Sequence, residues 1–160
     1  MRKLSRALWI LGIAGLLLTA APVSSFAQTD EPDAETQAVL DANQAFYTAF
    51  RTRDMDAMNA VWARGTDVSV IHPGWPNVSG RKNVMESWRG ILTGGAAPEI
   101  RSVNPDARIH GDMAYVVCYE DVGDGLLIAT NIFVREDGVW RMVHHQAGPT
   151  PRLPNQGRKI

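Results

Sequence analysis

Hydrophobic residues recur at helical spacing in the first third of the chain. One apolar stripe follows a period of about 3.6 residues, with Asp33 and Glu35 before it and Arg51 and Arg53 after it, as a helix dipole favours. The stripe consists of Val39, Leu40, Phe46, Tyr47 and Phe50. Asp54 has the side chain of a helix N-cap and predicts a second, shorter helix. The apolar residues of that helix are Met58, Val61 and Trp62.

A short β-branched stretch follows, and then a third helical pattern. Residues 67–72 predict a strand that ends at the turn Pro73-Gly74. Ser79 is the expected N-cap of the third helix, and Gly94-Gly95 is expected to end it. The apolar residues of this helix repeat at i, i+4, i+7 and i+8, and they are Val84, Trp88, Ile91 and Leu92.

From Glu99 onward the hydrophobic period changes to two, which predicts strands. The expected strands are 99–109, 113–122, 126–135 and 139–147, and they are separated by Gly and Asp residues typical of hairpin turns. Three helices followed by antiparallel strands predict an α+β fold, in which helices cover one face of a curved sheet. Such a sheet forms a half-cone, and its open end makes a pocket.

The N-terminal segment has the pattern of a secretory signal peptide. Arg2, Lys3 and Arg6 precede an apolar run over residues 7–21, and small residues lead to a cleavage site after Ala27. The alternative is an uncleaved anchor, but this run is shorter than the roughly 18 residues of a spanning helix. We therefore expect residues 1–27 to be removed and the protein to be periplasmic or secreted, without membrane contact after cleavage.

Length and composition indicate one domain after that cleavage. We expect a mobile lead-in over residues 28–34, the domain over 35–148 and a flexible tail over 149–160. The formal net charge of the whole chain is −1, and losing the basic N-terminus makes it more acidic, which does not support nucleic-acid binding. Cys118 is the sole cysteine, so no internal disulfide can form.

Several segments resemble the SnoaL-like branch of the nuclear transport factor two-like (NTF2-like) superfamily. The matching pieces are the Phe46-Tyr47 helix, the turn 72–75, Gly80-Arg81, Gly111-Asp112 and the final hairpin 131–145 with its Asp-Gly-x-Trp-x-x-Val-His pattern. The resemblance covers about residues 35–148 and implies the half-cone fold. Members of this superfamily include isomerases, hydrolases, cyclases and the association domain of calmodulin-dependent kinase, so the fold alone does not define a reaction. Two pocket arginines of that association domain correspond to Glu120 and Asn131 here, and its anion-binding pocket is therefore not expected.

The final hairpin and the resemblance together predict which side chains enter the pocket. Pairing around Asp137-Gly138 places Asn131 opposite His144, and alternation then turns Asn131, His144 and Gln146 to one face. The resemblance implies that Val116, Cys118 and Glu120 line the same pocket. We further expect His72 and Trp75 at its rim and Tyr47 reaching in from the first helix.

Glu120 is the most informative of these residues. A carboxylate that faces an apolar cone is desolvated, so its pKa rises and it can act as a general base near neutral pH. The alternative is that Glu120 pairs with an arginine or lies at the wet edge of the sheet. His144 is the expected proton partner, or else a buried histidine whose ring nitrogens are satisfied by Asn131 or by a backbone carbonyl.

Other chemistry is less well supported. His144 and His145 are adjacent on a strand and point to opposite faces, so a metal site would need His72, His144 and Glu120 to converge, and we expect none. Trp75 lies between prolines and can serve as a ligand lid or as a loop anchor. No sequence pattern of a cofactor site is present.

Two functional hypotheses follow from these observations. In the first, the protein binds a small, largely apolar molecule and performs cofactor-free acid/base chemistry, as an isomerase, cyclase, dehydratase or hydrolase. Glu120 would be the base, His144 its partner, and Asn131 and Tyr47 hydrogen-bond donors to developing charge. In the second, it is a non-catalytic binding or assembly module. The resemblance implies a homodimer in either case.

Overall fold

The computed structural model describes residues 32–95, 99–151 and 153. The predicted signal peptide 1–27 lies outside these residues, as do 28–31 of the predicted lead-in and 152 and 154–160 of the predicted tail. The described residues form three helices and a six-stranded sheet.

Aspartates cap the first two helices, and the Asp54 cap is the one that the sequence predicted. Helix α1 spans Ala34–Thr52, and the Asp33 carboxylate accepts a hydrogen bond from the Thr36 N–H at 2.7 Å. Helix α2 spans Met55–Val61, and the Asp54 carboxylate accepts from the N–H groups of Asp56 and Ala57. Each carboxylate satisfies N–H groups that lack a partner within the helix, which explains why both helices start there.

The third helix begins one residue later than its predicted cap implies. Helix α3 spans Arg81–Thr93, and its N-cap is Gly80, whose φ of 84° favours glycine. Ser79 instead belongs to the short strand β2, Val78–Ser79, which the sequence did not predict. The predicted Ser79 cap was therefore wrong, whereas Gly94 ends the helix as expected.

The sheet contains four long antiparallel strands. They are β3 (Arg101–His110), β4 (Met113–Asp121), β5 (Leu126–Glu136) and β6 (Val139–Pro149), and the order across the sheet is β2-β1-β6-β5-β4-β3. Strand β1, Ser69–Ile71, runs parallel to β6, so the sheet is mixed rather than purely antiparallel. Strand β6 also extends one residue into the predicted tail.

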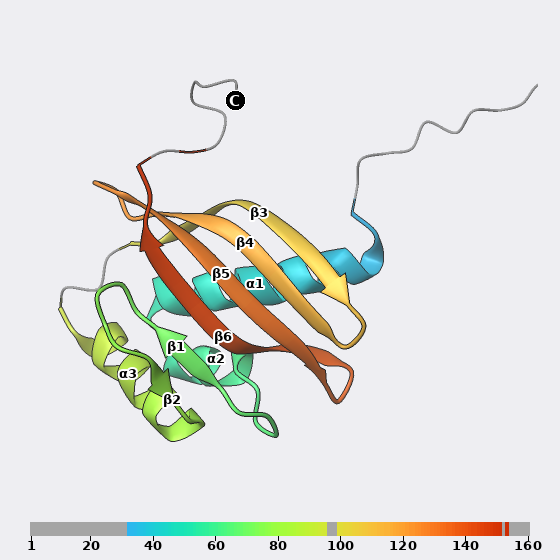
Figure 1. The fold of residues 1–160 in the computed structure, drawn as a ribbon. Helices are drawn as coiled ribbons and strands as arrows, with labels where there is room; N and C mark the ends of the chain where they lie inside the picture. The colour runs from blue at the N-terminus through green and yellow to red at the C-terminus, as the bar shows by residue number, and fades with distance from the viewer. Residues whose placement is uncertain (1–31, 96–98, 152, 154–160) are drawn as a thin grey trace, which may run out of the picture. The chain divides into compact units, whose positions relative to one another are not determined.

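The curved sheet wraps around α1, which lies behind it in Figure 1. Alternation along β4 turns Ala114, Val116, Cys118 and Glu120 inward, and all four are buried. The largest fully buried side chains include Phe46 of α1, Trp88 of α3, Phe133 of β5 and Trp62, which directly follows α2. This packing confirms the predicted α+β half-cone with helices on one face of the sheet.

A β-bulge changes the register of the last hairpin. Asn131 pairs with His145 and Ile132 with His144, but Phe133 pairs with Met142, so Val143 is an extra residue on β6. An inserted residue reverses the in-and-out alternation of everything beyond it. The predicted pairing of Asn131 with His144 was therefore wrong by one residue.

Candidate functional site

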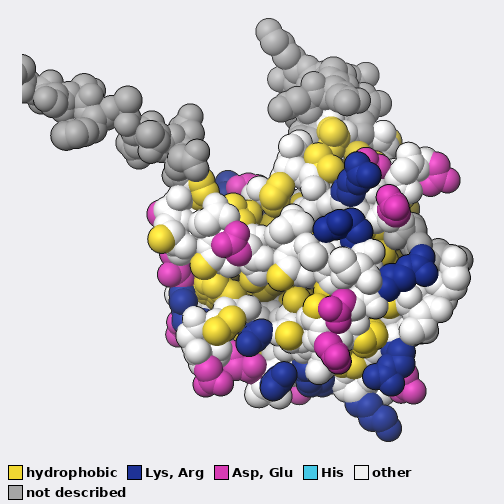
Figure 2. Space-filling model, turned by 180° about the vertical axis from the view of Figure 1, so that it is seen from behind, with side chains coloured by type: hydrophobic (Ala, Val, Ile, Leu, Met, Phe, Trp, Pro, Cys, Tyr) yellow, Lys and Arg dark blue, Asp and Glu magenta, His cyan; other side chains and the backbone are white. Residues whose placement is uncertain are grey.

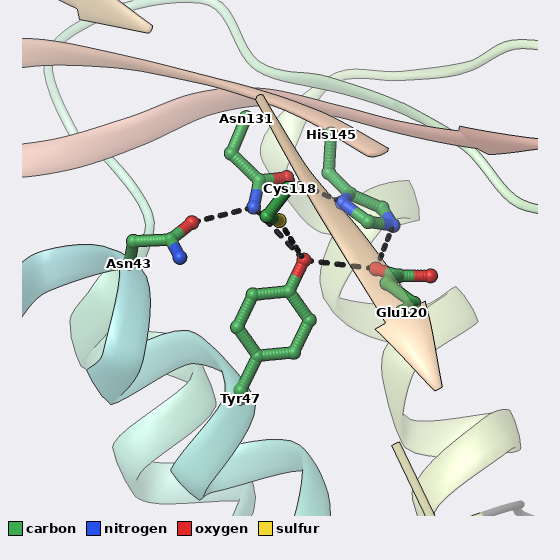
Figure 3. A network of polar contacts seen from close by, with 6 residues as sticks. All are labelled: Asn43, Tyr47, Cys118, Glu120, Asn131 and His145. Carbon is green, nitrogen blue, oxygen red and sulfur yellow. Dashed lines mark hydrogen bonds and ion pairs between the residues drawn. The ribbon is translucent and has the colours of Figure 1, made fainter. Parts of the chain in front are cut away.

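A buried polar network lies between α1 and the inner face of the sheet (Figure 3). Asn43 and Tyr47 come from α1, Cys118 and Glu120 from β4, Asn131 from β5 and His145 from β6. Asn43 and Tyr47 are four residues apart and therefore lie on the same side of α1. Three strands and one helix thus bring these six side chains together.

Glu120 is a buried carboxylate, with 2% of the residue exposed. Its Oε1 accepts a hydrogen bond of 2.9 Å from the Tyr47 hydroxyl, and its other polar contact among the described residues is His145 Nε2 at 3.9 Å. Burial raises the pKa of Glu120 to about 7, and the Tyr47 hydrogen bond offsets only part of that rise. Neither an arginine partner nor a wet sheet edge describes this environment.

His145 is the histidine that faces Glu120. Its Nδ1 lies 2.6 Å from the Asn131 Oδ1, and the residue is 3% exposed. Burial, together with smaller contributions from the neighbouring histidines His72 and His144, lowers the pKa of His145 to about 3. The imidazole is therefore neutral at physiological pH.

Tyr47 joins the two halves of the network. Its hydroxyl donates to Glu120, accepts from the Asn131 Nδ2 at 3.1 Å, and lies 3.1 Å from the Cys118 Sγ. Because the single hydroxyl hydrogen is used on Glu120, the thiol must donate to Tyr47. Burial and the nearby carboxylate raise the pKa of Tyr47, so it remains protonated.

Asn131 occupies the predicted inward position, but both hydrogens of its side-chain amide already bind protein groups. Its Nδ2 donates to the Asn43 Oδ1 at 2.7 Å as well as to Tyr47. Both amide hydrogens therefore bind protein groups. The sequence interpretation expected Asn131 and Tyr47 to donate to a ligand, but in this arrangement they position Glu120 and His145 instead.

The structure places His144 and Gln146 on the other face of the sheet. His144 is half-buried, and its Nδ1 lies 2.8 Å from the Ser69 Oγ of the adjacent strand β1. Gln146 is exposed and pairs in register with Thr130. Their predicted inward orientation was wrong because the bulge at Val143 shifts the alternation. His145 and Asn43 are the network members that the sequence interpretation missed.

Next to the network is a cavity of about 180 Å³, which we call the Glu120 cavity. Glu120 and His145 contribute its titratable inner groups, and aromatic and aliphatic side chains form most of its remaining lining. Those other lining residues are Phe50, His72, Pro73, Trp75, Trp88, Ile91, Ile100, Val122 and Leu127. Tyr47 and Asn131 do not line the cavity and lie behind Glu120 and His145.

His72 and Trp75 both line the cavity. His72 is buried, its Nε2 lies 3.0 Å from the Ser87 Oγ, and burial lowers its pKa to about 4. Trp75 is 49% exposed and packs edge-to-face on the His72 ring, with 5.0 Å between the ring centroids. Trp75 thus contacts both the cavity and solvent, which is the arrangement expected of a lid.

A second, larger hollow lies between α1, α2 and the hairpin of β5 and β6. It has a volume of about 530 Å³ and is lined mainly by alanines, Val61 and Val139, with Asp41, Arg135 and Arg141 among its polar residues. We call it the helix groove. Figure 2 shows the side of the molecule opposite the Figure 1 view, where hydrophobic side chains gather among charged ones.

Two negative findings apply to residues 32–95, 99–151 and 153. No group of three or more His, Cys, Asp or Glu residues there is placed to hold a metal ion. Within the same residues no helix is both long and apolar enough to cross a membrane.

Comparison with known proteins identifies the family. The SnoaL-like domain profile matches residues 39–150, which is most of the described domain. The chain therefore belongs to the SnoaL-like family, and its fold is that of the NTF2-like superfamily.

Individual relatives have diverse descriptions. The structure of a candidate dehydratase of the NTF2-like family from Streptomyces avermitilis is 30% identical, with a TM-score of 0.68, and the match covers 76% of this chain and 100% of that one. A candidate association domain of a calcium/calmodulin-dependent protein kinase type II from Thiobacillus denitrificans is 34% identical, with a TM-score of 0.56, over 69% and 93% of the two chains.

A plant relative is also similar in sequence. The F-box protein SKIP8 of Arabidopsis thaliana is 32% identical over 116 residues, which are 71% of this chain. The match spans only 50% of that relative's length. The activity of the whole relative therefore does not transfer to this chain.

Proposed function

We propose that this protein binds a small, largely apolar molecule in the Glu120 cavity and performs cofactor-free acid/base chemistry on it. One observation carries this proposal: a carboxylate with a pKa of about 7 lines an otherwise mainly apolar cavity. A base with a pKa near the ambient pH combines a useful ionised fraction with a strong drive to accept a proton. The similarity to a candidate dehydratase supports the same class.

The proposed roles follow the hydrogen-bond directions in the network. Glu120 accepts a proton from the substrate, and His145, rather than His144, is its proton partner, because its Nε2 lies 3.9 Å from Glu120 Oε1. Tyr47 holds Glu120 in place by donating to it. His72 and Trp75 bind the ligand at the outer part of the cavity. Isomerisation, cyclisation, dehydration and hydrolysis all fit a single base of this kind.

Native mass spectrometry of the purified protein tests the binding step. We expect a small molecule to co-purify with the wild type, and Leu127→Trp, which fills the cavity, to lose it. Ala45→Leu, in the helix groove, is the matched control and should retain it. Retention by Leu127→Trp together with loss by Ala45→Leu would place the ligand in the helix groove and overturn the proposal.

Secretion is part of the same proposal. The basic residues, apolar run and small-residue site at the N-terminus support export to the periplasm or the medium. Cell fractionation followed by N-terminal sequencing should find a mature protein that begins near Gln28. A protein that retains Met1 in the cytoplasmic fraction would contradict this assignment.

A specific observation also supports assembly through the sheet. In Figure 1, no helix of the described chain covers the front face of β4 and β5. Side chains on that face include Tyr115, Val117, Ile128 and Ile132, and Ile128 is 40% exposed. We propose that two copies pair through this face, in line with the similarity to a candidate kinase association domain.

Light scattering coupled to size-exclusion chromatography tests this assembly. We expect a dimer for the wild type and a monomer for Ile128→Arg, because an unpaired charge is costly to bury in an apolar interface. Val139→Arg changes a similarly exposed valine at the hairpin, 46% against 40% for Ile128, and should leave the dimer intact. A monomeric wild type would refute the proposed assembly.

A further inference from the structure

The hydrogen-bond directions determine what His145 offers to the cavity. With the Asn131 amide oriented as in the structure, its Nδ2 donates to Asn43 and Tyr47, so its Oδ1 must accept from the Nδ1–H of His145. A neutral imidazole that carries its hydrogen on Nδ1 has a lone pair on Nε2. This Nε2 is the atom that faces Glu120. His145 is therefore a hydrogen-bond acceptor toward the cavity.

The same reasoning applies to His72. The Ser87 hydroxyl donates its hydrogen to the Val84 carbonyl at 2.8 Å, so its oxygen accepts from the Nε2–H of His72. The Nδ1 of a neutral His72 then has a lone pair. All three titratable side chains that line the cavity, Glu120, His72 and His145, thus carry an acceptor atom that receives no hydrogen bond from a described side chain. The side-chain donors of the lining are the indole N–H groups of Trp75 and Trp88.

Glu120 also lacks a cationic partner. Its polar contacts among the described residues are a tyrosine hydroxyl and a neutral histidine. A buried carboxylate is strongly destabilised unless a positive charge or several hydrogen bonds compensate it. The aromatic residues Phe50, Trp75 and Trp88 line the same cavity, and the faces of such rings attract cations.

We propose that the ligand of the Glu120 cavity carries a protonated amine, which binds between the Glu120 carboxylate and the aromatic side chains. An ammonium group donates hydrogen bonds to Glu120 and His145 and supplies the positive charge that no described residue places beside Glu120. A ketone or a carboxylate lacks both properties. This inference rests on the proposed function, because it names the substrate class for the same cavity.

Cavity size restricts the ligand further. A volume of about 180 Å³ corresponds to roughly six water molecules at about 30 Å³ each. One ring or a short branched chain with a single amine matches that volume. Benzylamine is a suitable probe, and benzyl alcohol, benzaldehyde and benzoate share its skeleton but differ in the polar group.

Isothermal titration calorimetry at pH 8 tests the proposal. It measures the affinity of each of the four probes for the protein produced from the full-length gene. We expect benzylamine to bind at least about tenfold more tightly than benzyl alcohol, because hydrogen bonds between ions exceed neutral ones in strength. Benzoate should bind weakest, since it repels Glu120. Binding of benzaldehyde or benzoate at least as tight as that of benzylamine would overturn the inference while leaving the proposed binding function intact.

Two variants separate the charge of Glu120 from other effects. Glu120→Gln should remove the preference for benzylamine over benzyl alcohol, because glutamine retains the shape of glutamate but not its charge. Glu86→Gln, at an exposed position of α3, makes the same change in net charge and should keep the preference. A preference that survives in Glu120→Gln contradicts the inference. Failure of all four probes to bind the wild type would contradict both it and the proposed function.

The pH dependence provides an independent readout. Benzylamine remains protonated between pH 6 and 8, whereas Glu120 must lose its proton to bind it as an ion pair. Tyr47, Cys118 and His145 lie beside Glu120, and His72 lines the same cavity. Because both histidines are neutral, Glu120 is the group that ionises in this range. Benzylamine affinity should therefore rise several-fold from pH 6 to 8, and benzyl alcohol affinity should not. A flat benzylamine profile would oppose the inference.

Discussion

The two hollows of this molecule differ in a way that size does not reveal. The helix groove is the larger, at about 530 Å³ against about 180 Å³ for the Glu120 cavity. Yet both arginines of the groove already have protein partners. Arg135 forms an ion pair with Glu35 and stacks over Trp140, and Arg141 donates to the Ala60 carbonyl. The smaller cavity contains a carboxylate that has no cationic partner among the described residues.

This contrast indicates where binding energy is available. A group that is already satisfied gains little from a ligand, whereas an uncompensated buried charge gains a great deal. Volume alone would select the helix groove. The free acceptor atoms of Glu120 and His145 and the raised pKa of Glu120 indicate that the Glu120 cavity is the binding site.

The largest expected effect is on turnover. Once a substrate has been found, Glu120→Gln should lower its turnover by about 10²–10⁴-fold, the usual contribution of general acid/base catalysis. Asp41→Asn, which changes a carboxylate of the helix groove, should leave turnover unchanged. Steady-state kinetics of both variants measures this. Loss of turnover in Asp41→Asn alone would reverse the assignment of the two hollows.

Substitutions in the wall of the Glu120 cavity should lower the free energy of unfolding more than substitutions in the wall of the helix groove. Trp88 is 2% exposed and contacts Phe46, Phe50, Trp62 and His72, so Trp88→Ala should cost about 3–5 kcal/mol. Val139 lines the groove and is 46% exposed, so Val139→Ala should cost less than about 1 kcal/mol. Urea denaturation measures both. Equal costs would mean that the cavity wall is not part of the tightly packed core.

The pH dependence of stability should distinguish Glu120 from the buried histidines. The pKa of Glu120 rises from 4.5 to about 7 on folding, so its contribution is fully present below pH 4.5 and is lost as pH rises through 7. The pKa of His145 falls from 6.5 to about 3, so its contribution is present above pH 6.5 and is lost on acidification. As pH rises, the contribution of Glu120 to stability therefore falls, whereas that of His145 increases.

Comparing variants isolates the Glu120 contribution. Relative to the wild type, Glu120→Gln should gain up to about 3 kcal/mol between pH 4.5 and pH 8. Denaturant unfolding over this pH range provides the measurement, with Glu86→Gln as the control at an exposed position. A constant difference between wild type and Glu120→Gln would show that burial does not perturb the carboxylate.

The smallest expected effect concerns cavity volume. Leu127→Trp should weaken benzyl alcohol binding by about tenfold, since the larger side chain occupies part of the ligand's space. Ala45→Leu, in the helix groove, should have no effect. Titration calorimetry of both variants would show whether shape as well as charge distinguishes the hollows, and equal weakening would argue that it does not.

Much of the fold could be predicted from the sequence because its signals are local. Asp33 and Asp54 cap helices, and Asp137-Gly138 forms a hairpin turn with positive φ at both residues. These signals depend on a few neighbouring residues. Pairing of β1 with β6 depends on residues far apart in the chain, and it was not predicted.

The site was harder to predict because one residue changed its register. Glu120 lies on β4, where alternation is regular, and its inward orientation was predicted correctly. His145 lies beyond the bulge at Val143, where strict alternation selects His144 instead. Nothing in the local sequence marks that bulge. Asn43 had a usable signal, since it lies four residues before Tyr47 on the buried side of α1.

The parallel pairing of β1 with β6 has a consequence for how the protein matures. Ser69 and His144, which share a side-chain contact there, are 75 positions apart, so this contact requires nearly the whole domain to be synthesised. Contacts between such distant residues close large loops and form slowly. The cavity includes His72 from the loop after β1 and His145 from β6. Ligand binding should therefore appear only after β6 has paired with β1, and a bound ligand would stabilise that pairing by mass action.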